Sequence, residues 1–243
     1  MDHNVLVAFD FDHTICDDNT DLVVQELLGV AGRAISKDVE KLRRTSWIAY
    51  MGRIFELLQE VAVGPGQIEE TVVGIPAVAG MQELLVLLQA SGHEIVVISD
   101  SNSVFIDTWL RSRGLERVVS RVFTNPARYD DHGRLRVDGY HAQTACRLSP
   151  VNLCKGQILT DYVRDKREQG RTYARIVYVG DGSNDLCPIL RLSKTDLACP
   201  RKGYRLIERL DGSPSSTSIQ AKIVPWADGI ELQRSLKELI YFR

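Results

Sequence analysis

The sequence predicts an α/β fold in which a parallel sheet carries helices on both faces and a helical insertion follows the first strand. Three observations support this. Short apolar, β-branched runs recur, helical patterns separate several of them, and one long stretch contains no convincing strand. Strands that alternate with helices favour a parallel, Rossmann-like sheet. The expected strands cover residues 5–9, 95–98, 121–124, 176–179 and 196–198.

The stretch at 21–76 predicts a helical cap. Its apolar residues recur at helical spacing, which indicates a helix with one buried face. They are Trp47, Met51, Ile54, Phe55, Leu58 and Val61. Gly64 and Pro65 are expected to end this helix. We therefore expect a catalytic core over 1–20 and 77–243, with a cap over 21–76 as a candidate lid.

The remaining elements are read from local signals. A hairpin is expected near 129–140, where Asp-Asp-His-Gly stands between extended residues. The Ser/Thr/Pro-rich segment 213–218 is interpreted as a mobile loop. A helix is expected over 80–90, and Gly92 is expected to end it. Three further helices are expected: one that starts near residue 104, one over 157–162 and one over 186–192.

Composition excludes several classes of protein. The chain of 243 residues is 44% apolar and 26% charged, with a net charge of −2, so nothing points to nucleic acid or a membrane surface as partner. No segment has the length to span a bilayer, and no apolar leader precedes Asp10. Five widely spaced cysteines are interpreted as free thiols in a reducing compartment. The expected location is cytoplasmic, and the oligomeric state is left open.

Two carboxylates, Asp10 and Asp12, follow the first predicted strand. Side chains two apart on extended backbone project in the same direction, and ligands of open α/β sheets bind beyond the carboxyl ends of the strands. Because close carboxylates repel each other, the pair needs a cation, a shared proton or open solvent. A carboxylate nucleophile beside a carboxylic acid/base is one use of the pair. A strand that ends in an acidic turn is the other interpretation.

A third carboxylate, Asp181, follows the predicted strand 176–179 between two glycines. Glycine lets the backbone turn sharply and approach a ligand closely. Asp10, Asp12 and Asp181 at neighbouring strand ends suit Mg²⁺, which prefers carboxylate, water and phosphate oxygens. A plain glycine-rich turn is the alternative.

Ser99 and Lys155 are candidate ligands for a phosphoryl group. Ser99 follows the strand 95–98 and precedes a helix N-terminus, a ready anion site, although an ordinary helix cap explains the pattern as well. Lys155 would supply the positive charge that a phosphate among aspartates requires. A lysine at that position is more often simply solvated.

These four elements, in this order, resemble the haloacid dehalogenase superfamily of phosphohydrolases. Its pattern is Asp-x-Asp-x-Thr after the first strand, a Ser or Thr after a second strand, a Lys, and then Gly-Asp-Gly-x-x-Asp. The matching residues run from Asp10 through Ser99 and Lys155 to Asp185, within about residues 5–190. Each motif is weak by itself, whereas the ordered set is specific.

Further segments resemble the family that includes the phosphoethanolamine/phosphocholine phosphatase and its pyridoxal phosphate phosphatase relative. The similarity covers nearly the whole chain, and residues 101–107 lean towards the pyridoxal-type branch. The segments are 10–21, 98–102, 123–126, 152–155, 180–188 and 200–204. One departure stands out, because the family often carries Cys-x-x-Cys-Pro where this chain has Cys146, Ser149 and Pro150. It argues against a metal or redox role for that segment.

The resemblance implies two-step hydrolysis of a phosphomonoester. Asp10 attacks phosphorus and forms an aspartyl-phosphate, and Asp12 acts as general acid and then general base. Mg²⁺ is held by the Asp10 side chain, the Asp12 backbone carbonyl and Asp181. Asp185 supports this metal site without binding the ion itself.

The remaining implied roles concern phosphate and substrate. Ser99 and Lys155 hold the phosphoryl oxygens. The cap excludes water and contacts the leaving group. Asp21 and Asp100 match positions that bind the amine end of the substrate, although acidic charge near helix N-termini is their alternative role.

The expected partner is a small phosphorylated metabolite. Pyridoxal 5′-phosphate and phosphoethanolamine or phosphocholine are the leading substrates, and pyrophosphate or phosphoserine follow. A phosphotransferase or a non-catalytic phospho-acceptor protein is the alternative class of function. The presence of Asp12 argues against the phospho-acceptor, because a long-lived acyl phosphate needs no base for a second step.

Overall fold

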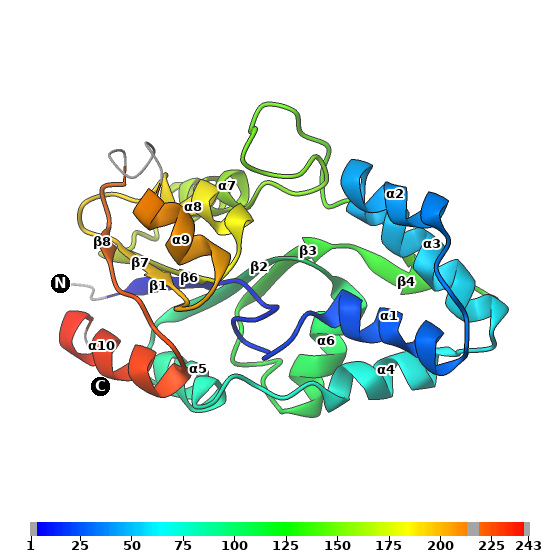
Figure 1. The fold of residues 1–243 in the computed structure, drawn as a ribbon. Coiled ribbons are helices and arrows are strands. Elements are labelled where there is room, and N and C mark those ends of the chain that lie inside the picture. The colour runs from blue at the N-terminus through cyan, green and yellow to red at the C-terminus, as the bar shows by residue number, and fades with distance from the viewer. Residues whose placement is uncertain (1–3, 213–218, 241–243) are drawn as a thin grey trace.

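The computed structural model describes residues 4–212 and 219–240, and it confirms the predicted α/β architecture (Figure 1). Six parallel strands form one sheet in the order β3-β2-β1-β6-β7-β8. They are β1 (Val5–Phe9), β2 (Glu94–Asn102), β3 (Arg121–Asn125), β6 (Arg175–Gly180), β7 (Leu197–Pro200) and β8 (Lys222–Ile223). The antiparallel hairpin of β4 (Ala127–Tyr129) and β5 (Leu135–Val137) lies outside this sheet.

Helices cover both faces of the sheet, because its central strand is apolar on both sides. Val7 and Phe9 of β1 pack on one face, whereas Leu6 and Ala8 pack on the other. The first face is covered by α5 (Met81–Ala90), α6 (Ser103–Ser112) and α10 (Gly229–Leu239). The second is covered by α7 (Lys155–Glu168), α8 (Leu186–Ile189) and α9 (Arg205–Gly212). This is the layered core expected when both sheet faces bury apolar side chains.

The stretch 21–76 is helical, as predicted. It contains α1 (Thr20–Val30), α2 (Lys37–Thr45), α3 (Trp47–Glu60) and α4 (Pro65–Gly74). The prediction that Gly64 and Pro65 end α3 is wrong. The helix ends at Glu60, and Gly64 is instead the N-cap of α4 with Pro65 in its first turn. Proline is tolerated there because a first-turn N–H has no partner within the helix.

Other boundaries differ because tertiary pairing overrides local signals. β2 runs past the expected end at Ile98 to Asn102, through a register shift against β3. The expected helix 186–192 is only α8, preceded by a 3₁₀ turn at Ser183–Asp185. β8 escaped prediction because it has two residues, both exposed. The loop interpretation of 213–218 lies outside the described residues.

The hairpin prediction is confirmed, and the hairpin packs against α3. Arg134 forms an ion pair with Glu56 at 2.8 Å, and the Gln59 side-chain amide donates to the His132 carbonyl at 3.0 Å. Within the described chain, no helix combines the length and apolarity needed to cross a membrane.

The start of α10 is pressed against the start of α5. The Gly229 amide donates to the Ala79 carbonyl at 2.8 Å. A Cβ atom at Gly229 would lie 2.4 Å from the Gly80 carbonyl carbon and from the Met81 amide nitrogen. Only glycine fits there without moving one helix relative to the other, since these neighbours are backbone atoms.

We therefore expect Gly229→Ala to lower the free energy of unfolding by about 1–3 kcal/mol through overpacking. Urea denaturation followed by circular dichroism measures this. The matched control is Gly52→Ala within α3, where a Cβ atom meets nothing within 4 Å. That variant should gain up to about 1 kcal/mol of stability, because alanine is the better helix former. Equal effects of the two substitutions would contradict the packing argument.

Candidate active site

Neighbouring strand ends bring the predicted acidic residues together. β1 lies between β2 and β6, and the Asp10 amide donates to the Val179 carbonyl at 2.9 Å. Asp181 follows β6 directly. Asp10, Asp181 and Asp185 each present a carboxylate oxygen within 4.8 Å of the other two, and all three are buried. The arrangement offers hard oxygen ligands of the kind that divalent cations such as Mg²⁺ prefer.

Lys155 lies between two of these carboxylates. Its ammonium nitrogen is 2.5 Å from Asp10 Oδ2 and 2.8 Å from Asp185 Oδ1, and its side chain is 1% exposed. Burial by itself would lower the pKa of Lys155, but the charges of Asp10 and Asp185 outweigh it and raise that pKa well above its usual value. The lysine therefore stays charged, and the solvated-lysine interpretation does not describe it.

Asp185 is fully buried and accepts hydrogen bonds at both oxygens. Besides Lys155, the Tyr178 hydroxyl donates to Oδ1 at 2.7 Å. The backbone amides of Asp181 and Gly182 donate to Oδ2 at 3.1 and 2.9 Å. These bonds fix the loop that carries Asp181, so the geometry is compatible with the predicted supporting role.

Gly180 explains why Asp185 comes so close to the backbone. A Cβ atom at Gly180 would lie 2.4 Å from Asp185 Oδ2. Any larger residue would push the Asp185 carboxylate away from the two amides that it accepts from. This close approach is what the glycine next to Asp181 provides.

The single positive charge of Lys155 does not balance the three carboxylates of Asp10, Asp181 and Asp185. Burial and the neighbouring Asp185 raise the pKa of Asp10 to about 7, despite Lys155. Burial, Asp10 and Asp185 raise the pKa of Asp181 to about 8, although the Thr14 hydroxyl donates to its Oδ1 at 3.2 Å. A bound cation relieves both costs, because it replaces the missing countercharge.

The Asp12 carboxyl group points to the first residue of α1. The Thr20 amide donates to Oδ1 at 3.2 Å, and the Thr20 hydroxyl donates to Oδ2 at 3.3 Å. Burial, together with the charges of Asp21 and Asp10, raises the pKa of Asp12 to about 8. At neutral pH this carboxyl group holds a proton, which a general acid requires.

The turn after Asp12 is held by Arg201, which directly follows β7. His13 adopts a left-handed conformation with φ of 54°. Arg201 donates to the His13 carbonyl at 2.6 Å and forms an ion pair with Asp17 at 2.8 Å. This turn orients Thr14 towards Asp181.

Ser99 lies within β2 rather than at its end and is 1% exposed. Its hydroxyl oxygen accepts from the Ser101 amide at 3.2 Å, and Ser101 in turn bonds to the Thr20 hydroxyl at 2.8 Å. The N-cap of α6 is Asn102, which accepts from the Phe105 amide at 3.1 Å. Ser99 is therefore not that helix's cap, and its role in phosphate binding stays a prediction.

Asp21 and Asp100 lie close enough for their charges to interact, and the charge of Asp21 also acts on Asp12. The Trp47 indole donates to Asp21 at 2.6 Å, and the Asn184 amide donates to Asp100 at 2.7 Å. Burial, opposed by the Trp47 hydrogen bond and aided by the charge of Asp100, raises the pKa of Asp21 to about 6. Burial likewise raises the pKa of Asp100. No described lysine, arginine or histidine forms an ion pair with either one.

Sequence reasoning missed several residues that orient this site. Trp47 was assigned to an apolar helix face, yet its indole reaches Asp21. Asn184 lies in segment 180–188 and Asn152 in segment 152–155. Both side-chain amides reach Asp100, that of Asn152 at 3.4 Å. Their amide side chains next to assigned residues were the available signal. Nothing in the local pattern marks Tyr178.

Comparison with known proteins identifies the family. The chain matches the family described as Putative Phosphatase over residues 5–240. It is 38% identical over 239 residues to pyridoxal phosphate phosphatase PHOSPHO2 of Mus musculus, covering 97% of this chain and 98% of that protein. It is 33% identical over 241 residues to the phosphoethanolamine/phosphocholine phosphatase of Homo sapiens, covering 97% and 89%.

Solved structures share the fold. Phosphoserine phosphatase in its apo form aligns with a TM-score of 0.61 at 18% identity, over 97% of this chain and 99% of that one. A haloacid dehalogenase family hydrolase from Salmonella enterica aligns with a TM-score of 0.63 at 18% identity, over 98% and 71%. Together with the matched sequences, they show that the chain belongs to the Putative Phosphatase family of phosphomonoester hydrolases with the haloacid dehalogenase fold.

Proposed function

We propose that this phosphatase hydrolyses a small phosphomonoester whose alcohol carries a cationic nitrogen, through an aspartyl-phosphate formed on Asp10. The observation that carries the chemical step is the buried contact of Lys155 with Asp10. It holds one Asp10 oxygen in place and puts a positive charge where phosphoryl oxygens would collect. Phosphoryl transfer depends mainly on such positioning and charge stabilisation.

Two displacements make up the reaction. In the first, an Asp10 carboxylate oxygen bonds to phosphorus, the bond to the alcohol oxygen breaks, and Asp12 gives that oxygen its proton. In the second, Asp12 takes a proton from water, whose oxygen attacks phosphorus and releases inorganic phosphate and free Asp10. The raised pKa of Asp12 suits the first step, since a proton is available at neutral pH.

Mg²⁺ is the cation that the carboxylate cluster fits. The Asp10 and Asp181 side chains and the Asp12 backbone carbonyl would hold it, and it would neutralise charge on the phosphoryl oxygens. Asp10, Asp181 and Asp185 have carboxylate oxygens within 4.8 Å of one another, and Lys155 is shared between Asp10 and Asp185. This excess of negative charge supports the assignment. Asp185 would keep the Asp181 loop in place.

Asp21 and Asp100 favour a substrate with positive charge. Both carboxyl groups lie beyond the catalytic set, and neutral Trp47 and Asn184 side chains are their hydrogen-bond donors. Pyridoxal 5′-phosphate and phosphoethanolamine each combine a phosphate ester with a basic nitrogen, and relatives named for both share about a third of the sequence. Phosphoserine fits less well, because its carboxylate would meet two further carboxylates.

We also propose that residues 21–76 work as the cap. Asp21 and Trp47 extend from these helices to the catalytic residues, which supports contact with the leaving group. Since the hairpin of β4 and β5 packs on α3, we assign it to the same substrate-covering region.

The covalent step predicts that Asp10→Asn lowers kcat for p-nitrophenyl phosphate by at least about 1,000-fold, because the amide is a poor nucleophile. Phosphate release in the presence of Mg²⁺ measures this. Asp131→Asn in the exposed hairpin turn removes the same charge and should retain activity. Comparable rates for Asp10→Asn and the wild type would exclude a covalent intermediate on Asp10.

The raised pKa values predict that Mg²⁺ binding releases protons. Burial and carboxylate repulsion raise the pKa of Asp10 to about 7 and of Asp181 to about 8, so both groups are partly protonated near neutral pH. The Mg²⁺ concentration for half-maximal activity should therefore fall as the pH rises from about 6 to about 8, by up to roughly tenfold per pH unit for each proton released. Calorimetry in buffers of different ionisation enthalpy counts those protons. A chelator should abolish activity until Mg²⁺ is restored, and a half-saturation that ignores pH would contradict the model of the site.

Asp21 should govern preference for cationic substrates. Asp21→Asn keeps an oxygen for the Trp47 indole but removes the charge, so the ratio of kcat/KM for phosphoethanolamine to that for p-nitrophenyl phosphate should fall by about tenfold. Because burial and Asp100 raise the pKa of Asp21 to about 6, the wild-type ratio should itself fall as the pH drops through that value.

The matched control is Asp38→Asn on the exposed face of α2, where the side chain is 88% exposed. That ratio should stay at the wild-type value. If Asp21→Asn slows both substrates equally, Asp21 serves folding or catalysis in general, and the assignment to the cationic group is wrong.

A further inference from the structure

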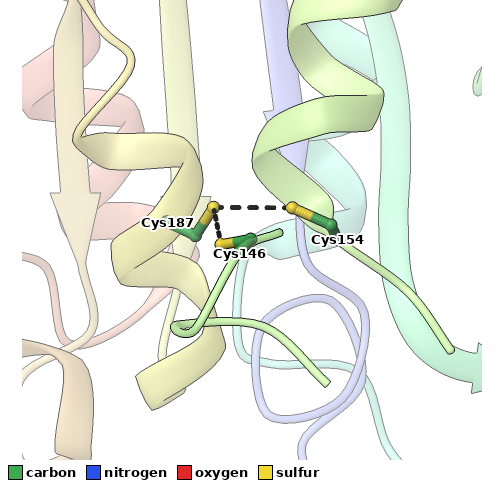
Figure 2. A group of neighbouring side chains, drawn as sticks. All are labelled: Cys146, Cys154 and Cys187. Atoms are coloured by element: carbon green, nitrogen blue, oxygen red, sulfur yellow. Dashed lines mark hydrogen bonds between the residues drawn. The ribbon is translucent and has the colours of Figure 1, made fainter. Parts of the chain in front are cut away.

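Three cysteines from separate parts of the chain converge in the structure (Figure 2). Cys146 lies in the long connection between β5 and α7, Cys154 is the N-cap of α7, and Cys187 lies in α8. The sulfur of Cys187 is 3.4 Å from that of Cys146 and 3.7 Å from that of Cys154. All three sulfurs lie within 4.8 Å of one another.

The spacing of the sulfurs fits a common metal ion. Zinc–sulfur bonds of about 2.3 Å in a tetrahedral site put sulfur atoms about 3.8 Å apart. A disulfide would require about 2.05 Å between two of them and would leave the third without a role. A group of three thiols at this spacing is the donor set of a soft cation, not of the hard cation that the aspartates attract.

The surroundings of the cluster also suit bound metal. The Ser149 hydroxyl oxygen lies 3.5 Å from the Cys146 sulfur and is a candidate fourth ligand. The backbone approaches closely at Gly156, where a Cβ atom would lie 2.6 Å from the Cys187 sulfur. The first-turn amides of α7, which lack partners within the helix, favour negative charge at the thiolates.

The protonation state of Cys146 agrees with this geometry, whereas burial raises the pKa of Cys187 to about 11, so a metal ion would have to displace its proton. Burial raises the pKa of Cys146, but hydrogen bonds with Ser149 and Cys187 outweigh it and lower that pKa to about 7. A thiolate, the form that binds metal, is therefore accessible at neutral pH.

The sequence comparison argued against a metal role for the segment around Cys146, but it did not include Cys154 and Cys187, which the fold brings to Cys146. We propose that Cys146, Cys154 and Cys187 bind one Zn²⁺, with Ser149 or a water molecule as the fourth ligand. The ion would join the connection before α7 to α7, which begins with Lys155, and to α8, which directly follows Asp185. Cys154 directly precedes Lys155, and Cys187 comes two residues after Asp185. The zinc would therefore brace the Lys155–Asp185 contact.

The test is metal binding by the full-length reduced protein after treatment with a chelator. Titration with Co²⁺, a spectroscopic substitute for Zn²⁺, should give one equivalent of thiolate-to-metal charge transfer together with strong tetrahedral ligand-field bands. Zn²⁺ should displace the Co²⁺ and abolish these bands, and excess Mg²⁺ should not. Zn²⁺ should also raise the melting temperature, because the three thiols that folding brings together bind it more tightly than the unfolded chain does.

Two cysteine variants separate the cluster from other thiols. Cys146→Ser should weaken Zn²⁺ binding by more than the roughly 10–100-fold that loss of an outer partner costs. Cys199→Ala removes a buried cysteine that does not belong to the cluster and should bind one equivalent as the wild type does. Ser149→Cys should tighten binding by adding a fourth thiolate.

Three results would overturn the proposal. The first is the absence of the charge-transfer band in the wild type, which needs no variant to interpret. The second is equal affinity in the wild type and Cys146→Ser. The third is a Cys146–Cys187 disulfide in the protein as isolated without reductant, in which each thiol has given a proton and an electron to oxygen. That result would make the cluster a redox pair.

Discussion

The buried contact of Lys155 with Asp10 and Asp185 organises the whole site. Removing the lysine charge would leave both carboxylates without an ion-pair partner in the interior, and removing one partner of a buried ion pair typically costs about 3–5 kcal/mol. Lys155 begins α7, Asp10 follows β1, and Asp185 lies in the turn after β6. The contact therefore joins one helix to the ends of two neighbouring strands. Asp185 then passes the constraint on, because it holds the amides of the loop that carries Asp181.

An excess of negative charge follows from that arrangement. Six carboxyl groups lie in and around the site. Among the described residues, Lys155 is the cation that forms ion pairs with this set, and it contacts two of them. The six belong to Asp10, Asp12, Asp21, Asp100, Asp181 and Asp185. The raised pKa values of Asp10, Asp12 and Asp181 express this deficit. A divalent cation and a positively charged substrate are two ways to relieve it. The acidity of the site thus connects the catalytic chemistry with the choice of substrate.

The cysteine cluster addresses a different mechanical problem. The connection from β5 to α7 has no helix or strand of its own between residues 138 and 154, yet it delivers Asn152 and Lys155 to the site. Backbone hydrogen bonds between its two ends, from His141 to the Asn152 carbonyl and from Gln143 to the Val151 carbonyl, hold it as a closed loop. A soft cation on three sulfurs would fasten that loop to α8, while oxygen ligands nearby select a hard cation.

How much of this was accessible from sequence depends on the range of the interactions. The central strands were predictable because apolar runs report burial on both faces. The clustering of Asp10 with Asp181 and Asp185 was predictable because they follow those strands in a recognisable order. Local signals failed where one pattern serves two structures, as at Pro65, which begins α4 rather than ending α3. Three contacts join residues that lie 26 to 41 positions apart in the sequence. They are Trp47 with Asp21, Lys155 with Asp185, and Cys146 with Cys187. Such contacts arise only when helices pack on a common sheet, and no periodicity along the chain encodes that packing.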